Sequence, residues 1–511
     1  MMNSFWLRPA YQKHSRGTKW LKLNKTLTIT TRVLLFLFFF ALLLVSVLIF
    51  GGWINLGNYS AGKFFDRTPI LPPPEFPLDC VAWDHNKTCP NNYPIKYEPT
   101  NHHPSSTCPD YFRWIHEDLK HWKGTGVTRD MVERARESAH FRLVILHGKV
   151  YVEKFVESIP NRESFTMWGI LQLLRLYPGR LPDLELMFDN DDRPVIASKD
   201  YRGPNAAAPP LFRYCSDQWN LDIVFPDWTF WGWPETNIKP WRSILKDIKE
   251  GNNKTKWRDR VPYAYWRGNP DVASWRGDLM TCNVTDKDDW NTHLYVQNWE
   301  EEVRTGFKQS NIADQCTHRY KIYIEGYGWS VSEKYIFACD SPVLLMTPPR
   351  FHDFFIRGMV PQRHYWPVKD NDKCRSLKFA VEYGNNHTEK AEEIGAAGSH
   401  FIHEDMKMEY VYDYIFHLLN EYGKLLKFKP TIPPNAIEFC AESVACPAEE
   451  IWRKSMEESL EKSPRNMLPC TLPPSYDLDE LKALNDEKFM LTKQVEKWEN
   501  EYWKNNLTKN Q

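Results

Sequence analysis

The chain has 511 residues, which is enough for two or three domains with sizeable cores and excludes a miniature scaffold. Its formal net charge is −1, so no global basic field indicates a nucleic-acid partner. The charge is unevenly distributed, because no acidic residue precedes Asp66.

Residues 33–54 form a nearly uncharged run dominated by Leu, Phe, Val and Ile. About 20 such residues span a bilayer. Basic residues precede the run and place that end in the cytosol; they are Arg8, Lys13, Arg16, Lys19, Lys22, Lys25 and Arg32. We therefore predict a cytosolic tail (1–32), a single membrane anchor (33–54) and a luminal remainder, as in type II proteins of the Golgi or endoplasmic reticulum. A cleaved signal peptide is disfavoured, because the run is too long and its preceding segment too extended.

Sequons and cysteines agree with this topology. Beyond the anchor, six Asn-x-Ser/Thr sequons predict glycosylation at Asn58, Asn86, Asn253, Asn283, Asn386 and Asn506. All 11 cysteines also lie beyond the anchor, where an oxidising compartment permits disulfides. Their number is odd, so at least one is free or pairs between chains. Their spacing is too wide for a zinc knuckle.

The remaining chain predicts an α/β protein in four segments. Prolines dominate residues 55–110, which indicates an extended stem, and folded structure is expected from about Tyr111. Residues 111–240 are expected to form a first lobe, 241–430 a second lobe, and 431–511 a cysteine-containing extension that ends in a charged helix. Alternation and helical periodicity predict strands at 141–146, 150–155, 184–188, 261–268 and 364–369, and helices at 130–137, 164–176, 241–250, 373–383, 388–399 and 408–422.

An acidic cluster, residues 189–194, directly follows the apolar strand 184–188. Ligands of open α/β folds collect at carboxyl ends of strands, so the cluster is a candidate site, although its composition also suits a polar turn. One aspartate could act as a general base. Alternatively, Asp189 and Asp191 form a D-x-D pattern of hard oxygen ligands for Mn²⁺ or Mg²⁺.

Tryptophans and arginines supply further candidates. The segment FPDWTFWGWP contains Trp228 and Trp231, whose ring faces could stack on a sugar or base, or else pack between domains. Arg267 stands at the exit of strand 261–268, and Arg276 follows it. An arginine fixed at a strand end can clamp a phosphate, while surface ion pairing is the alternative.

Residues 319–346 have the outline of a nucleotide site. A strand leads through Gly326 and Gly328 to a short helix with Ser330 as its expected N-cap and Glu333 closing a capping box, and then to the buried strand 343–346. The N-terminus of such a helix suits a diphosphate. A crossover without a ligand is the alternative.

Several ordered strings together resemble glycosyltransferase family 90, the Rumi-like protein O-glucosyltransferases and capsule-associated transferases. They are GRLPDLELMFDNDDRP, FPDWTFW, AYWRGN, the 320–345 unit and GSHFIHEDMKMEYVYDYIFHLLNEY, and the plant members are most similar. The resemblance implies two Rossmann-like lobes of the GT-B type that hold a UDP-sugar, with inverting transfer and no metal or other cofactor.

Residue by residue, the resemblance assigns the catalytic carboxylate to Asp192, with Asp191 as a neighbour on the substrate side. It assigns a donor-binding arginine to Arg267 and predicts a disulfide between Cys316 and Cys339. The chain departs from the family at Ser332, where an arginine reaches the diphosphate in relatives. The phosphate clamp is then expected from Ser330, Ser332, Lys334 and Arg267, with Gly328 and Arg276 nearby.

The predicted function is transfer of a sugar, glucose or xylose, from a UDP-sugar to a hydroxyl of a protein or glycan in the secretory pathway. Two alternatives stay open at this point. One is a metal-dependent D-x-D transferase. The other is a membrane-tethered glycan-binding module without catalysis, in which the tryptophans form the binding face.

Overall fold

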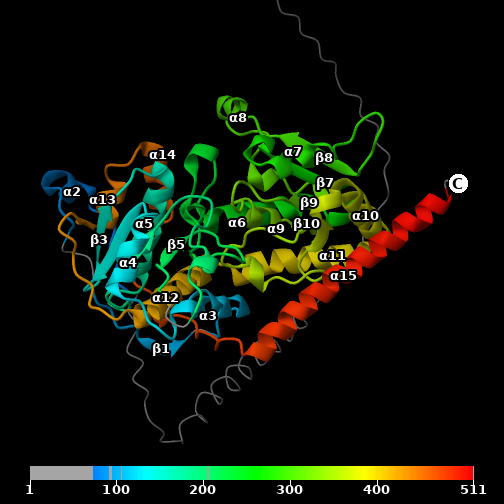
Figure 1. Cartoon of the computed structure of the whole chain (residues 1–511). Coiled ribbons are helices and arrows are strands. Elements are labelled where there is room, and N and C mark those ends of the chain that lie inside the picture. The colour runs from blue at the N-terminus through cyan, green and yellow to red at the C-terminus, as the bar shows by residue number, and fades with distance from the viewer. Residues whose placement is uncertain (1–72, 91–94, 105, 204–206, 510–511) are drawn as a thin grey trace, which may run out of the picture. The chain divides into compact units, whose positions relative to one another are not determined.

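The computed structural model describes residues 73–90, 95–104, 106–203 and 207–509 (Figure 1). The predicted tail and anchor, the first part of the stem and Asn58 lie outside these residues. Within the described ranges, no helix is both long and apolar enough to cross a membrane. Residues 71–511 form one compact unit.

The first lobe is built on a six-stranded mixed sheet. Its strands, in spatial order, are β12 (Ile437–Phe439), β3 (Lys149–Lys154), β2 (Phe141–Leu146), β4 (Leu184–Phe188), β5 (Leu211–Arg213) and β6 (Ile223–Val224). His147 and Gly148, which both have positive φ, join β2 to β3 as an antiparallel hairpin, and this agrees with the two strands predicted on either side of them. Only the β4–β5 and β5–β6 pairings are parallel, whereas β12–β3, β3–β2 and β2–β4 are antiparallel, so this sheet departs from a fully parallel Rossmann sheet.

The second lobe is built on a five-stranded sheet in which every pairing is parallel. Its strands, in spatial order, are β11 (Trp366–Lys369), β10 (Val343–Thr347), β9 (His318–Tyr323), β7 (Val261–Gly268) and β8 (Thr292–Val296). In chain order this arrangement reads 5-4-3-1-2, with the order reversing between β7 and β9. In such sheets, ligands bind outside the carboxyl ends of the strands at the reversal.

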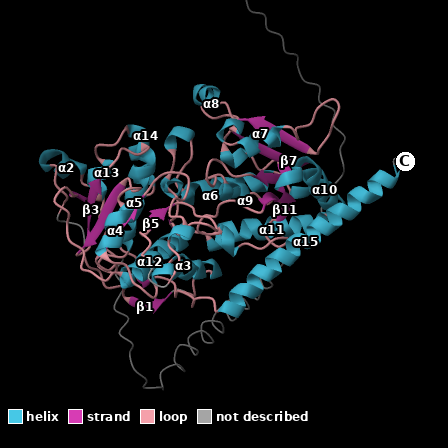
Figure 2. Cartoon of the chain, viewed as in Figure 1, coloured by secondary structure: helices cyan, strands magenta, loops and turns pink. Residues whose placement is uncertain are grey.

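The described helices lie around and between the two groups of strands in Figure 2. They are α2 (Cys80–Asn86), α3 (Trp114–Asp118), α4 (Arg129–Ala135), α5 (Pro160–Leu176), α6 (Trp241–Lys254), α7 (Ser274–Met280), α8 (Trp299–Thr305), α9 (Glu333–Phe337), α10 (Lys373–Asn386), α11 (Thr388–His400), α12 (Met408–Leu425), α13 (Ala441–Ala445), α14 (Glu450–Glu458) and α15 (Leu478–Lys509). A small parallel pair joins β1 (Asn101–Pro104) to β13 (Met467–Leu468).

Helix α12 differs from its predicted place in the second lobe. Its apolar stripe is buried, as periodicity predicts. However, the stripe faces the first sheet, where the Tyr422 hydroxyl donates to the Glu185 carbonyl (3.0 Å) and its ring contacts Phe212. Periodicity shows that one helix face is buried, but it does not say which lobe covers that face.

The stem prediction fails for its described second half. Helix α2 lies within it, and three disulfides fasten this segment to the C-terminal extension: Cys80–Cys446, Cys89–Cys440 and Cys108–Cys470. Proline-rich composition indicates extended backbone, but it does not reveal that cysteines over 350 residues apart will pair. Folded structure therefore begins well before Tyr111.

Candidate active site

A pocket of about 460 Å³ lies at the order reversal of the second sheet and is closed by the first lobe. Arg267 and Gly268 at the end of β7 line one side, and Gly326, after β9, lines another. Asp192 and Arg162 face the pocket from the first lobe. The pocket therefore combines a carboxylate from one lobe with strand ends from the other.

Asp192 is held by an arginine that the sequence did not point to. Arg162, on α5, pairs with the Asp192 carboxylate (2.9 Å) and donates to the Asn190 carbonyl (2.8 Å). Its guanidinium also lies over the Trp228 ring, 4.6 Å from the centroid. In the sequence, Arg162 is recognisable only as a basic residue near the start of an apolar helix, and this position does not identify its partner. Because both side chains are partly buried, the pair fixes the direction of the carboxylate.

The other aspartates of the acidic cluster are placed differently. Asp189 is buried and paired with Arg213. Its Oδ1 atom also forms a hydrogen bond with His140 Nδ1 (3.0 Å). This hydrogen bond raises the pKa of His140. Asp191 is exposed and its N–H donates to Asp189 (2.8 Å), so the structure does not bring the Asp191 carboxylate to the pocket.

The D-x-D pattern fits a metal poorly. Ligand atoms of His140, Asp189 and Asp191 lie within 4.8 Å of one another, as a cation site requires. The guanidinium of Arg213 already neutralises Asp189, and a divalent cation there would have to displace it.

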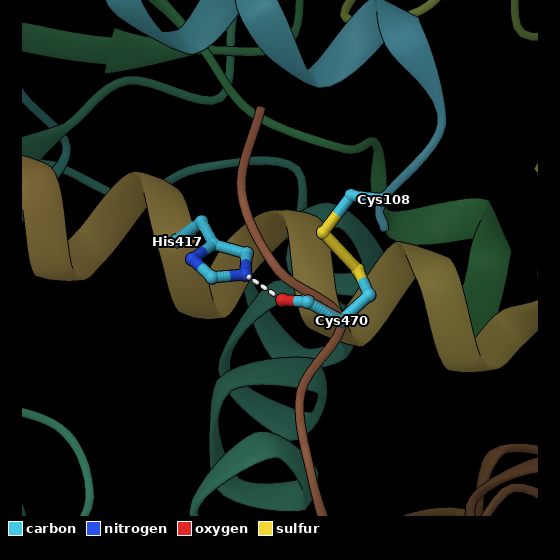
Figure 3. A group of neighbouring side chains, drawn as sticks. All are labelled: Cys108, His417 and Cys470. Carbon is cyan, nitrogen blue, oxygen red and sulfur yellow. Dashed lines mark hydrogen bonds between the residues drawn. A yellow bond between two sulfur atoms is a disulfide. The ribbon is translucent and has the colours of Figure 1, made fainter. Parts of the chain in front are cut away.

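A second cluster of potential metal ligands consists of a disulfide and a neighbouring histidine. Figure 3 shows Cys108 and Cys470 joined through their sulfur atoms, with the His417 imidazole donating to the Cys470 carbonyl (2.7 Å). Disulfide sulfurs are not thiolate ligands, so this group has a structural role.

The two candidate tryptophans separate. Trp228 lines the pocket. Trp231 is fully buried, and its indole N–H donates to the Tyr412 hydroxyl (3.0 Å), while Gly169 leaves room for its ring. The substrate-platform prediction is therefore wrong for Trp231, which belongs to the core. Composition alone cannot separate two indoles three residues apart.

The candidate arginines both line the pocket but with different attachments. Arg267 donates to the Tyr265 hydroxyl (3.2 Å) and lies 3.7 Å from Glu302. Arg276 donates to the carbonyls of Ile324 (3.1 Å) and Glu325 (2.9 Å). Arg276 thus fastens the end of β9, whereas Arg267 remains the better placed for an anion.

The predicted capping box is wrong. The Ser330 hydroxyl bonds the Ser332 hydroxyl (2.8 Å), and α9 begins only at Glu333 and has five residues. Both serines line the pocket. Lys334 points the other way, into a buried ion pair with Asp227 (2.6 Å), so it cannot complete the clamp as expected.

Gly328 has a role that its nucleotide-loop assignment did not foresee. A Cβ atom there would lie 2.0 Å from the Asp192 carbonyl oxygen. The backbone after β9 therefore packs directly against the residue that carries the candidate catalytic carboxylate.

The disulfide prediction is confirmed, because Cys316 and Cys339 are joined. Cys282 and Cys374 form a further bridge, and among the described cysteines Cys215 is left free and buried. The odd count is thereby explained.

The sequons differ in their surroundings. Asn253 and Asn386 are exposed, and Asn506 is half-buried on α15. The Asn283 side chain bonds both the N–H and the carbonyl of Leu294. Asn86 lies at the end of α2, and glycosylation at all of these sites stays a prediction.

A pocket that joins a fixed carboxylate to strand ends of a parallel sheet is the site of an α/β enzyme, and the comparisons identify that enzyme as a transferase. The chain belongs to glycosyl transferase family 90, whose model matches residues 103–499. It is 26% identical over 349 residues to protein O-glucosyltransferase 1 of Homo sapiens, covering 66% of this chain and 84% of the relative. It is 24% identical over 346 residues to the O-glucosyltransferase rumi of Drosophila melanogaster, covering 65% and 81%.

Proposed function

We propose that the protein is a GT-B-type, inverting, metal-independent glycosyltransferase that moves glucose or xylose from a UDP-sugar to a hydroxyl of a protein. The observation that carries this proposal is the carboxylate of Asp192 facing a pocket that also contains Arg267 at the sheet reversal. The names of the relatives support glucose as donor sugar and protein as acceptor. Family membership favours the enzyme over a glycan-binding module.

In the proposed reaction, Asp192 accepts the proton of the acceptor hydroxyl as its oxygen attacks the anomeric carbon of the sugar. The bond from that carbon to the diphosphate oxygen breaks, and the electron pair leaves with UDP. Arg267 and the hydroxyls of Ser330 and Ser332 stabilise the developing charge on the diphosphate. Arg162 keeps the Asp192 carboxylate aimed at the acceptor.

Metal independence is supported by the ion pair between Arg213 and Asp189, because the arginine already neutralises the carboxylate that a metal ion would need. EDTA treatment is therefore expected to leave transfer unchanged. Loss of activity that added Mn²⁺ restores would instead support the D-x-D mechanism.

A luminal location, behind an anchor at residues 33–54, is also proposed. Five disulfides among the described cysteines suit an oxidising compartment. Protease added to sealed microsomes should spare the chain beyond residue 54, and digestion of that part would contradict the topology.

The substitution Asp192→Asn tests the proposed function. The amide keeps the shape but cannot accept the proton, so we expect transfer to fall by about 10²–10⁴-fold with UDP affinity retained. Release of UDP from a panel of UDP-sugars measures transfer, and calorimetry measures affinity. Asp191→Asn is the matched control, because this exposed neighbour lies outside the pocket. Retained turnover in Asp192→Asn would remove the general-base assignment.

A further inference from the structure

The pocket contains a buried side-chain amide whose oxygen accepts no hydrogen bond from the described residues. Gln297 directly follows β8 and lines the pocket, with only 8% of its surface exposed. Among the described residues, its Oε1 atom finds no hydrogen-bond donor. A buried polar atom without a partner destabilises the folded protein, so a ligand that donates to it would remove this penalty.

The place of Gln297 in the sheet indicates which part of a ligand it meets. Its backbone N–H donates to the Gly268 carbonyl (2.8 Å), which holds it beside the end of β7. In dinucleotide-binding sheets, the phosphates lie at the order reversal, and a side chain about 20 residues further along contacts the nucleoside. Gln297 follows the second strand of this sheet, on the side of β7 away from β9. It therefore lies where a nucleoside extends from a diphosphate at the reversal.

An aromatic face adjoins the amide. Trp299 begins α8 two residues later, lines the same pocket and is 43% exposed. A flat indole beside a pocket provides a stacking surface for a planar base. A stacked base would present its hydrogen-bonding edge to a neighbouring polar group.

We propose that Gln297 reads the base of the nucleotide donor by pairing with the imide edge of uracil, while Trp299 stacks on the ring; this rests on the proposed UDP-sugar donor. Oε1 accepts from the N3–H of uracil, and Nε2 donates to an adjacent base carbonyl. The terminal torsion of glutamine is soft, so the amide can turn to present both atoms. A ribose diol offers two donors and is better matched by a carboxylate, which favours the base as the partner of this amide.

Nucleotide titrations of the full-length chain test the assignment without any substitution. By calorimetry, UDP is expected to bind about tenfold more tightly than 3-methyl-UDP or CDP, which both lack the N3–H, because one hydrogen bond is worth about a factor of ten. dUDP is expected to bind about as well as UDP. A loss with dUDP but none with 3-methyl-UDP would assign the amide to the ribose and overturn the proposal.

The substitution Gln297→Met removes the amide at similar length. We expect it to lower UDP affinity about tenfold and to abolish the preference for UDP over CDP and 3-methyl-UDP. Gln172→Met is the matched control, since Gln172 is buried, accepts the Glu461 N–H (2.9 Å) and lies outside the pocket. A preference retained in a folded Gln297→Met variant overturns the inference alone. If the wild-type chain binds none of the nucleotides, the proposed donor class fails with it.

Discussion

A single buried lysine shows how far burial in this fold can lower the pKa of one residue. Lys321, on β9, is 2% exposed, and its ammonium group donates to the Gln315 carbonyl (2.9 Å) and lies over the Tyr265 ring. Burial, with a smaller contribution from Arg260, lowers its pKa to about 7. The unfolded chain would hold this proton up to a pH near 10.5.

Lys321→Met is therefore expected to stabilise the protein at neutral pH. Between about pH 7 and 10.5 the unfolded wild-type chain binds more protons than the folded one, so its stability should rise with pH. The gain from the substitution, about 2 kcal/mol at pH 7 after loss of the hydrogen bond, should shrink over this interval. Urea unfolding at several pH values measures it.

Lys246→Met, at an exposed position on α6, serves as the control and should change stability little at any pH. Parallel stability profiles for wild type and Lys321→Met would show that the buried lysine keeps an ordinary pKa.

At the scale of elements, the segment after β9 connects the two lobes at the site. Arg193 donates to the Tyr327 carbonyl (2.7 Å) and lies over its ring. Trp329 packs against Tyr214 of the first lobe. Residues 326–332 therefore line the pocket on one side and support the Asp192 backbone on the other.

Gly328→Ala tests this double role. Its Cβ would lie 2.0 Å from the Asp192 carbonyl oxygen and 2.7 Å from the carbonyl carbon, and neither backbone atom can rotate away. A shift of about 1 Å in a catalytic group can cost about 10²-fold, so a fall in kcat of at least tenfold is expected, with UDP affinity less affected. Steady-state rates and calorimetry measure the two effects.

Gly124→Ala is the control, because a Cβ at this exposed glycine would have no atom within 4 Å and the residue lies outside the pocket. Equal kcat in the two folded variants would mean that the Asp192 position does not depend on this contact.

At the scale of the whole described unit, disulfides and one long helix connect segments that lie far apart in the sequence. Three disulfides join residues 80–108 to residues 440–470. Helix α15 then runs from Glu480, which pairs with Arg113 ahead of the first sheet (2.5 Å), to Trp498, which stacks on Trp366 of β11 (Figure 1). Helix α15 therefore links the two lobes outside the pocket, whereas the disulfides fasten the N-terminal segment to the C-terminal extension.

The double substitution Cys108→Ser with Cys470→Ser should destabilise the unit without changing the site. Two neighbouring disulfides already close the same large loop, so the expected loss is about 3 kcal/mol rather than that of an open loop. Denaturant unfolding measures it, and kcat in mild conditions should be unchanged.

Cys215→Ala is the control, because it removes a buried thiol that forms no bridge among the described residues, and should cost less. If the Cys108→Ser and Cys470→Ser double variant has the same unfolding midpoint as wild type, this disulfide adds no stability once the other two are formed.

The sequence by itself determined the features that depend on neighbouring residues. Alternating and apolar runs predicted β2, β3, β4 and β7, and periodicity predicted the buried stripe of α12. The acidic cluster after β4 was also located in this way, and the resemblance to the family then assigned the catalytic role within it to Asp192. Each of these patterns lies within a single helix or strand, where backbone geometry sets the period of the side chains.

Only the tertiary structure decided which distant groups meet. It paired Arg162 with Asp192, turned Lys334 from the expected phosphate to Asp227, and directed Trp231 into the core while Trp228 lines the pocket. It also placed α12 on the first sheet and fastened the proline-rich segment to the C-terminal extension. A charge or ring carries the same local signal whether its partner is solvent, a ligand or a residue 100 positions away, so the partner is fixed only when the two lobes pack.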